Sequence, residues 1–310
     1  MTDVAIIGAG VTGLSCARRL ADAGVQVVVF DKGRGIGGRL ATRRAENDLQ
    51  FDHGAQHITA TDAGFQDVLN AALEAKALAT WPTASTQGAY VGTPGMTGFA
   101  KFLGRGIGVQ QKAEVTNVLR GDDMWHVVVG GDAHAFDRVV CTSPAPQTTA
   151  LLHHHLAGVE HLAEVYYDPC LTLMVGLKGN VDLPDAAKSP ASAFAWVARD
   201  SAKPGRPSSS CWVAQATADW SRKHLEKTKE EICDIMLDLF LHHAKVAADD
   251  VIYATGHRWR HALVAKPLGQ PFVKDATRTL YAGGDWCLGP RVEHAWQSGT
   301  AIADDLLTGL

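Results

Sequence analysis

Three glycines near the start of the chain have the spacing of a phosphate-binding turn. Gly8, Gly10 and Gly13 form the pattern G-x-G-x-x-G, and Asp31 follows at the expected end of a second strand. The first glycine allows a tight bend, the second lets a pyrophosphate approach the backbone, and the third lets a helix pack closely on a strand. A carboxylate about 20 residues further on hydrogen-bonds a ribose hydroxyl. The pattern therefore predicts a dinucleotide-binding site.

A second glycine-rich stretch, "DKGRGIGGRLATRR" at residues 31–44, begins with this same acid. Because a carboxylate at Asp31 would repel a 2′-phosphate, NAD or FAD remains. FAD bound in an extended form passes its pyrophosphate and ribityl chain along such a loop, and an arginine such as Arg39 can pair with phosphate bidentately. The stretch favours FAD over NAD. We expect Arg43 and Arg44, beyond the glycine turn, to lie on the solvated surface.

The residues around these glycines predict a strand, a helix and a second strand. Residues 4–8 and 25–31 are short apolar runs, and residues 11–24 repeat apolar side chains at helical spacing. A similar strand and helix pattern returns at 279–287 and 291–307. We therefore predict one dinucleotide domain that is assembled from separated segments of the chain.

The middle of the chain predicts mostly strands. Short strand patterns occur at 112–120, 124–130 and 136–143, and a helix is expected over 63–78. Residues 165–260 carry further strand-like runs, the loop "SAKPGRPSSS" and one long amphipathic helix over about 219–245. The predicted fold is α/β, with an inserted, mostly antiparallel β domain for the substrate. We assign 1–60, 94–150 and 270–310 to the FAD-binding domain, and 61–93 and 151–269 to the substrate domain.

Composition argues against several partners. The formal net charge is -4 in 310 residues, so neither nucleic acid nor an anionic membrane is an expected partner. We find no signal peptide and no 18-residue apolar stretch, and the six cysteines contain no C-x-x-C pair. These features indicate a cytoplasmic protein with reduced thiols. His153–His155 are expected on a solvated helix face, and no metal site is predicted.

Together, these motifs resemble the flavin amine oxidase superfamily, and more closely the bacterial renalase-like oxidoreductases. The glycine fingerprint alone would indicate only the broad glutathione-reductase-like class. The resemblance becomes more specific through its C-terminal motif, and it covers essentially the whole chain. The motifs are "VAIIGAGVTGLSCARRL", "FDKGRGIGGRLATRR", "DHGAQHITA" and "GGDWCLGPRVEHAWQSG".

The resemblance implies how FAD would be held. It places Asp31 on the adenosine ribose, Arg39 near the phosphates, residues 54–56 beside the isoalloxazine ring and the Val115 backbone at the adenine. It also implies a non-covalent cofactor, with Cys287 as a buried structural thiol. The predicted cofactor-binding residues are Gly8, Gly10, Val11, Thr12, Gly13, Asp31, Lys32, Gly38, Arg39, Gly54, Ala55, Gln56, Met96, Val115, Gly284, Asp285, Arg291 and Val292.

The substrate pocket is predicted from aromatic and polar residues, and no catalytic base can be assigned. Relatives would have a tyrosine at His57 and a histidine at Gln215, so these two departures leave the substrate open. Planar aromatic side chains would suit a planar substrate. The pocket candidates are Gln56, His57, Trp196, Trp212, Gln215, His257, Trp259 and Trp286.

Three functions fit this pattern. The resemblance implies a FAD-dependent oxidase that takes hydride from 2- or 6-dihydro-NAD(P) and reduces oxygen to hydrogen peroxide. The wider superfamily implies oxidation of an amine or a polyene instead. A flavin-binding protein without catalysis is the third. The sequence does not fix the oligomeric state.

Overall fold

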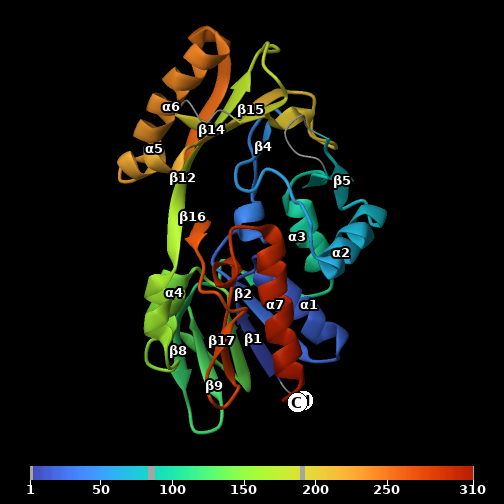
Figure 1. The fold of residues 1–310 in the computed structure, drawn as a ribbon, viewed down its shortest axis with the longest axis vertical. Helices are drawn as coiled ribbons and strands as arrows, with labels where there is room; N and C mark the ends of the chain where they lie inside the picture. Colours follow the sequence, from blue (N-terminus) through green and yellow to red (C-terminus); the bar gives the residue numbers. More distant parts are fainter. Residues whose placement is uncertain (1–2, 83–87, 189–192, 310) are drawn as a thin grey trace.

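The computed structural model describes residues 3–82, 88–188 and 193–309 in two parts that long strands connect (Figure 1). The lower part contains a six-stranded sheet in the order β17-β18-β11-β1-β2-β7, parallel except for β17. Its strands are β1 (Asp3–Ile7), β2 (Gln26–Asp31), β7 (Gly108–Gln111), β11 (Arg138–Cys141), β17 (Val273–Lys274) and β18 (Leu280–Ala282). The C-terminal strand therefore returns to the N-terminal sheet, as predicted.

Helices cover one face of this sheet and a small sheet covers the other. Helices α1 (Val11–Asp22) and α7 (Val292–Leu307) lie side by side, so closely that a Cβ on Gly299 would meet the Thr12 carbonyl oxygen at 2.2 Å. On the opposite face, Trp125 and Phe136 join the core around Phe30. They belong to a three-stranded antiparallel sheet of β8 (Val115–Arg120), β9 (Trp125–Val129) and β10 (Asp132–Phe136), of which β10 was not predicted.

The upper part is a five-stranded antiparallel sheet with helix α6 on one face. The strand order is β13-β14-β15-β12-β16, which confirms the predicted antiparallel insertion. Ile232, Met236 and Phe240 of α6 pack on the sheet core. The elements are β12 (Tyr166–Leu177), β13 (Ala186–Lys188), β14 (Phe194–Arg199), β15 (Ser210–Ala216), β16 (Val251–Lys266) and α6 (Lys229–Ala244).

The single helix predicted over 219–245 is wrong, because two helices occupy this segment. They are α5 (Ala218–Lys223) and α6, and Thr228 caps the second. The Thr228 hydroxyl accepts from the Glu231 N–H at 3.2 Å, and the Glu231 carboxylate accepts from the Thr228 N–H at 2.7 Å. This reciprocal capping box starts a new helix. The T-x-x-E pattern in the sequence already carried that signal.

Residues 61–82 and 88–93 pack against both parts. Phe65 and Val91 share a hydrophobic core with α1, and Trp196 of the upper sheet joins the same core. The domain boundary that we placed here remains a prediction. The remaining elements are β3 (Thr42–Arg44), β4 (Gln50–Asp52), α2 (Ala63–Glu74), β5 (Leu78–Thr80), β6 (Tyr90–Gly92), α3 (Thr97–Leu103), α4 (Ala145–Leu152) and short 3-10 turns at Gly38–Leu40, Val159–Glu164, Asp200–Ala202, Ala248–Asp250 and Asp285–Cys287.

Two further features concern membranes and metals. Within the described ranges, none of the helices combines the length and apolar character needed to cross a bilayer. The same ranges hold no group of three His, Cys, Asp or Glu side chains that could ligate a metal ion. We expected His153–His155 on a solvated helix face, but they follow the end of α4 in a turn.

Trp212 does not line a substrate pocket, contrary to expectation. Successive side chains of a strand alternate between faces, so Trp212 and Gln215, three residues apart, lie on opposite faces of β15. Trp212 is 0% exposed and packs against Phe240 of α6, with ring centroids 6.2 Å apart. It belongs to the core under the helix.

We expect Trp212→Ala to reduce the free energy of unfolding by about 3–5 kcal/mol, because the substitution leaves a large cavity in that core. Urea unfolding of the FAD-loaded protein measures this change. Leu239→Ala on the exposed surface of α6 is the control and should stay within about 0.5 kcal/mol of the unchanged protein. A small loss of stability, accompanied by a changed flavin spectrum, would instead place Trp212 at the cofactor.

Candidate functional site

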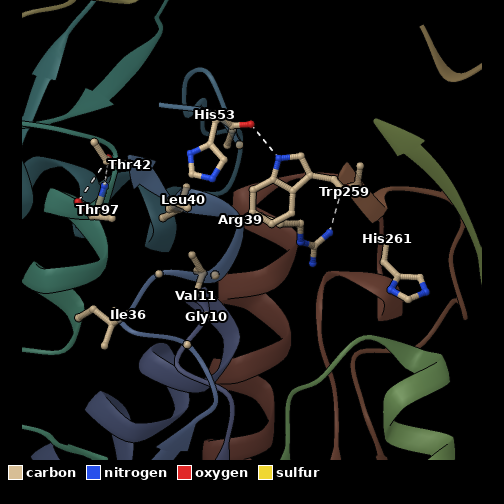
Figure 2. A pocket seen from close by; sticks show the side chains of 18 of the residues that line it. Gly10, Val11, Ile36, Arg39, Leu40, Thr42, His53, Thr97, Trp259 and His261 are labelled. Carbon is tan, nitrogen blue, oxygen red and sulfur yellow. Dashed lines mark hydrogen bonds between the residues drawn. The ribbon is translucent and has the colours of Figure 1, made fainter. Parts of the chain in front are cut away.

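A cavity of about 2460 Å³ lies between the two parts. Its walls come from the glycine turn before α1, the second glycine loop, residues 53–59, one face of the upper sheet and the start of α7. Figure 2 shows Gly10 and Val11 on one side of it, and His53 and Trp259 on another. Segments that are far apart in the sequence therefore meet around one large space.

The glycine turn has room for a ligand at one position only. Gly8 adopts φ +106°, and a Cβ on Gly13 would meet the Gly8 carbonyl oxygen at 2.0 Å, so the protein itself requires both glycines. Gly10 has an ordinary φ of -77°, and a Cβ there would meet no atom within 4 Å. No side chain caps the N-terminus of α1 at Gly10. The first-turn N–H groups and an open approach thus suit a pyrophosphate.

Asp31 connects the two glycine loops. Its carboxylate accepts hydrogen bonds from the N–H groups of Ala9 and Gly33, both at 2.6 Å, and it lines the cavity with Lys32 and Val115. These contacts hold the acid at the end of β2. A ribose at this end of the cavity would meet a fixed carboxylate.

Arg39 is paired with an acid from the other end of the chain. Its guanidinium donates to both carboxylate oxygens of Asp285, at 2.7 and 2.6 Å, and to the Ala262 carbonyl at 3.0 Å. Burial alone would lower the pKa of Arg39, but the Asp285 carboxylate raises it above the ordinary value. Arg39 therefore links the N-terminal loop to the C-terminal segment on the cavity wall, and its charge is already balanced without a phosphate.

Most of the remaining predicted cofactor residues line the cavity, with two exceptions. Gly38, Gly54, Ala55, Gln56, Gly284, Arg291 and Val292 line it, together with Gly8, Gly10, Val11 and Thr12. Gly13, the first exception, does not line the cavity; it lets α1 pack closely against the turn at Gly8. Met96, which the resemblance places at the cofactor, is 0% exposed and does not line the cavity; its sulfur accepts from the Gly92 N–H at 3.3 Å. Cys287 is likewise fully buried, outside the cavity wall.

The predicted pocket residues of the upper sheet share one face. The strand pairings place Trp196, Gln215, Thr172 and His257 in one row across β14, β15, β12 and β16. Trp196, Gln215 and His257 line the cavity, and so does Trp259, two residues further along β16. The alternation of strand side chains therefore brings these residues together, although more than 60 positions of sequence separate the first from the last.

Hydrogen bonds hold residues 53–57 against this row. The Gln215 amide donates to the Gly54 carbonyl at 2.7 Å, and the Trp259 indole donates to the His53 carbonyl at 2.8 Å (Figure 2). The His53 ring also stacks on Trp259, with centroids 5.4 Å apart, and meets the edge of His257 at 4.8 Å. Sequence analysis missed His53, although it directly precedes Gly54 in the quoted motif "DHGAQHITA".

The imidazoles of this wall are uncharged at neutral pH. Burial, with a smaller effect from Arg43, lowers the pKa of His53 to about 4. Burial and the neighbouring His53 lower the pKa of His257 to about 3, and burial also lowers the pKa of His57. Trp286 lies on the cavity wall near α4, where its indole donates to the Ser143 carbonyl at 3.0 Å. The wall can thus offer aromatic surfaces and neutral hydrogen-bonding groups.

A buried group of four charges lies behind residues 53–57. Asp52 and Asp200 meet Lys203 and Arg206, and all four side chains are at most 1% exposed. Lys203 donates to Asp200 at 2.6 Å and to the Gln56 amide oxygen at 3.2 Å. Lys203 and Arg206 come from the segment "SAKPGRPSSS" that sequence analysis treated as an ordinary loop.

Comparisons with known proteins agree with this architecture. A family model described as an NAD(P)-binding Rossmann-like domain matches residues 6–72, and one described as a flavin containing amine oxidoreductase matches residues 84–307. A 4,4'-diapophytoene desaturase from Staphylococcus aureus (strain Newman) is 38% identical over 68 residues, which are 22% of this chain and 13% of the desaturase. The sequence match to this curated relative is therefore confined to a short part of its length.

Two solved structures share the fold along the whole chain. A proposed protoporphyrinogen oxidase from Exiguobacterium sp. 255-15 has a TM-score of 0.74 at 11% identity, with 100% of this chain and 99% of that chain covered. A triple mutant of putrescine oxidase has a TM-score of 0.74 at 12% identity, with 99% of each chain covered. At such low identity these likenesses show the fold alone.

Gly10→Val should yield protein without flavin. The valine side chain would occupy the open approach at the start of α1, yet it would meet no protein atom near its Cβ, so the fold should persist. Flavin content after purification and the circular dichroism spectrum measure the two effects. Gly108→Val is the matched control, because its Cβ also meets nothing within 4 Å and Gly108 lies outside the cavity. Full flavin content in Gly10→Val would contradict this placement.

Acid should destabilise the protein through His53. Below about pH 6.5 the unfolded imidazole gains a proton, whereas the folded one remains neutral to about pH 4, so stability falls as the pH decreases through this window. We expect His53→Gln to reduce the difference in unfolding free energy between pH 7 and pH 5 by about 1–2 kcal/mol. Urea unfolding at both pH values measures it. The exposed residue His154, replaced by Gln, should leave the difference unchanged.

Proposed function

Because the chain belongs to the flavin-containing amine oxidoreductase family and has FAD as its cofactor, we propose that it oxidises a dihydronicotinamide dinucleotide. The substrate would carry its extra hydrogen at ring position 2 or 6, in place of the ordinary position 4. The products would be oxidised dinucleotide and, with oxygen as the acceptor, hydrogen peroxide. The wider family activity, oxidation of an amine or a polyene, is the alternative.

The residues present fit FAD. The turn at Gly8, Gly10 and Val11 would hold the pyrophosphate, Asp31 would hold the adenosine ribose, and Gly54 with Ala55 would lie beside the ring system. The space beside Gly10 supports this assignment, because no protein atom lies within 4 Å of the position that a Cβ would take there. When bound, FAD accepts two electrons from the substrate and returns them to an acceptor.

The single observation that carries the substrate proposal is the charge of the cavity wall. Among the described residues of the five-stranded sheet, none that lines the cavity is acidic. The charged residues of that sheet on the wall are Lys188, Arg258 and Arg260, and all three are cations. An alkylammonium substrate would find no counter-charge there, whereas an anionic dinucleotide would be attracted.

The protonation state of the wall points in the same direction. An amine substrate must lose a proton before it gives up hydride, but burial makes His53 and His257 very weak bases. A dihydropyridine becomes an aromatic cation when it loses hydride, so no proton need be removed from it. The residues then have only to orient a flat ring.

Trp196, Trp259 and Gln215 suit this orienting role. The two indoles offer flat apolar surfaces for a nicotinamide ring. The Gln215 side chain is anchored because its amide nitrogen donates to the Gly54 carbonyl, which leaves its amide oxygen as an acceptor for the carboxamide of the substrate. Each residue positions the substrate and none transfers a proton.

Stopped-flow mixing of the anaerobic FAD-loaded protein with candidate reductants tests the proposal. The 2- and 6-dihydro isomers should bleach the flavin absorbance rapidly, and ordinary 4-dihydro NADH and primary amines should not. Admission of air should then restore the colour and release hydrogen peroxide. Rapid bleaching by an amine alone would favour the alternative, and bleaching by none of these reductants would favour a flavin-binding protein without this activity.

A further inference from the structure

Arg43 lies on the cavity wall and not on the solvated surface that the sequence led us to expect. It is half-buried in β3, directly opposite Phe51 of β4. Side chains opposite each other in an antiparallel pair share one face. The Phe51 ring stacks on Tyr253 of β16, with centroids 5.3 Å apart, so Arg43 lies on the face of the hairpin that is turned to β16.

Arg43 is also unpaired, unlike the other partly buried arginines of this wall. Its guanidinium makes no hydrogen bond or ion pair with any residue that the structure describes. Arg39 is paired with Asp285, Arg291 with Glu293, and Arg258 donates to two backbone carbonyls. None of its nitrogens is among the buried side-chain atoms without a partner in the described residues, so its donors face the open cavity, where a ligand can supply acceptors.

Arg43 lies on the side of the cavity that we assign to the substrate. Its positive charge acts on both His53 and His257, so it lies within electrostatic reach of the neutral imidazoles. Both rings contact Trp259, the proposed surface for the nicotinamide ring. The start of α1, where the pyrophosphate of FAD would lie, is a different part of the wall.

We propose that Arg43 binds the pyrophosphate of the substrate and so selects a phosphorylated nicotinamide over an unphosphorylated one. The inference rests on the proposed function. The guanidinium fork matches two phosphate oxygens, which a lysine cannot do in the same geometry. The other cations on the wall whose side chains have no partner among the described residues are all exposed, whereas Arg43 is half-buried; they are Arg34, Arg44, Lys101 and Lys188. Lys188 adjoins His57 on the opposite side of the row.

Binding of product-like ligands to the oxidised, FAD-loaded protein tests this role without turnover. Titration with NAD+ and with nicotinamide riboside, followed by the flavin absorbance spectrum, gives two dissociation constants. We expect Arg43→Gln to weaken NAD+ binding by about 10- to 100-fold, the range for losing a hydrogen-bonded ionic contact, and to change riboside binding less than twofold. Arg44→Gln is the matched control, because Arg44 also lines the cavity but is exposed and, opposite Gln50, lies on the other face of the same strand. It should change neither constant by more than about twofold.

Several results would overturn the inference. These are equal weakening of both ligands by Arg43→Gln, no weakening at all, or selective weakening by Lys188→Gln in place of Arg43→Gln. Flavin content and thermal midpoint equal to those of the unchanged protein show that the Arg43 variant folds.

Inorganic pyrophosphate separates this inference from the proposed function. FAD already occupies its own phosphate site, so added pyrophosphate reports on a second one. Binding of pyrophosphate that requires Arg43, in a protein that binds neither NAD+ nor the riboside, would retain an anion site and reject the nicotinamide substrate. Failure of the unchanged protein to bind NAD+ or pyrophosphate would reject both.

Discussion

The buried charges of Asp52, Asp200, Lys203 and Arg206 are the interaction on which the site most depends. Two acids and two bases meet in a region that water does not reach. Removing any one of them would leave an uncompensated buried charge, at a cost of about 3–5 kcal/mol. Burial raises the pKa of Asp200. For Asp52, burial also favours the protonated form, but Lys203 and Arg206 outweigh it and lower the pKa.

This network determines where residues 53–57 run. Asp52 ends β4, and its carboxylate also accepts from the Thr42 hydroxyl at 2.6 Å and the Met96 N–H at 2.9 Å. Lys203 orients Gln56, whose amide nitrogen donates to the Asp52 and Gly54 carbonyls. The charges of the upper part thus hold the segment that would lie beside the flavin ring, and they join the two parts of the molecule.

Local patterns made the lower part predictable from sequence. The turn from Gly8 to Gly13, the strand that ends at Asp31 and the returning C-terminal strand depend on short stretches whose residue types have few alternatives. The row of Trp196, Gln215 and His257 was predicted as a set of candidates, and strand alternation explains why they meet. Alternation also separates Trp212 from Gln215, but only the position of α6 decides which of them faces the cavity.

Long-range pairing made the rest unpredictable. Lys203 and Arg206 belong to a loop whose composition is typical of a solvent-exposed loop. The acid with which both of them pair, Asp52, lies about 150 residues earlier. The charge of Arg39 likewise has its partner 246 residues away. Arg43 was expected in solvent for the same reason, because only the packing of the β3–β4 hairpin against β16 places it on a wall.

The order of the strands has a consequence for how the protein is made. β1, at the middle of the sheet, has β11 beside it and β18 beyond, while α1 rests on α7 near the C-terminus. During synthesis at about 5–20 residues per second, the segment that ends at Asp31 waits roughly 15–55 s for residue 307. Through that interval the glycine turn is present without Asp285 or the helix that covers it. A nascent chain therefore cannot complete its cofactor site before β18 and α7 have been synthesised, and flavin loading must follow that step.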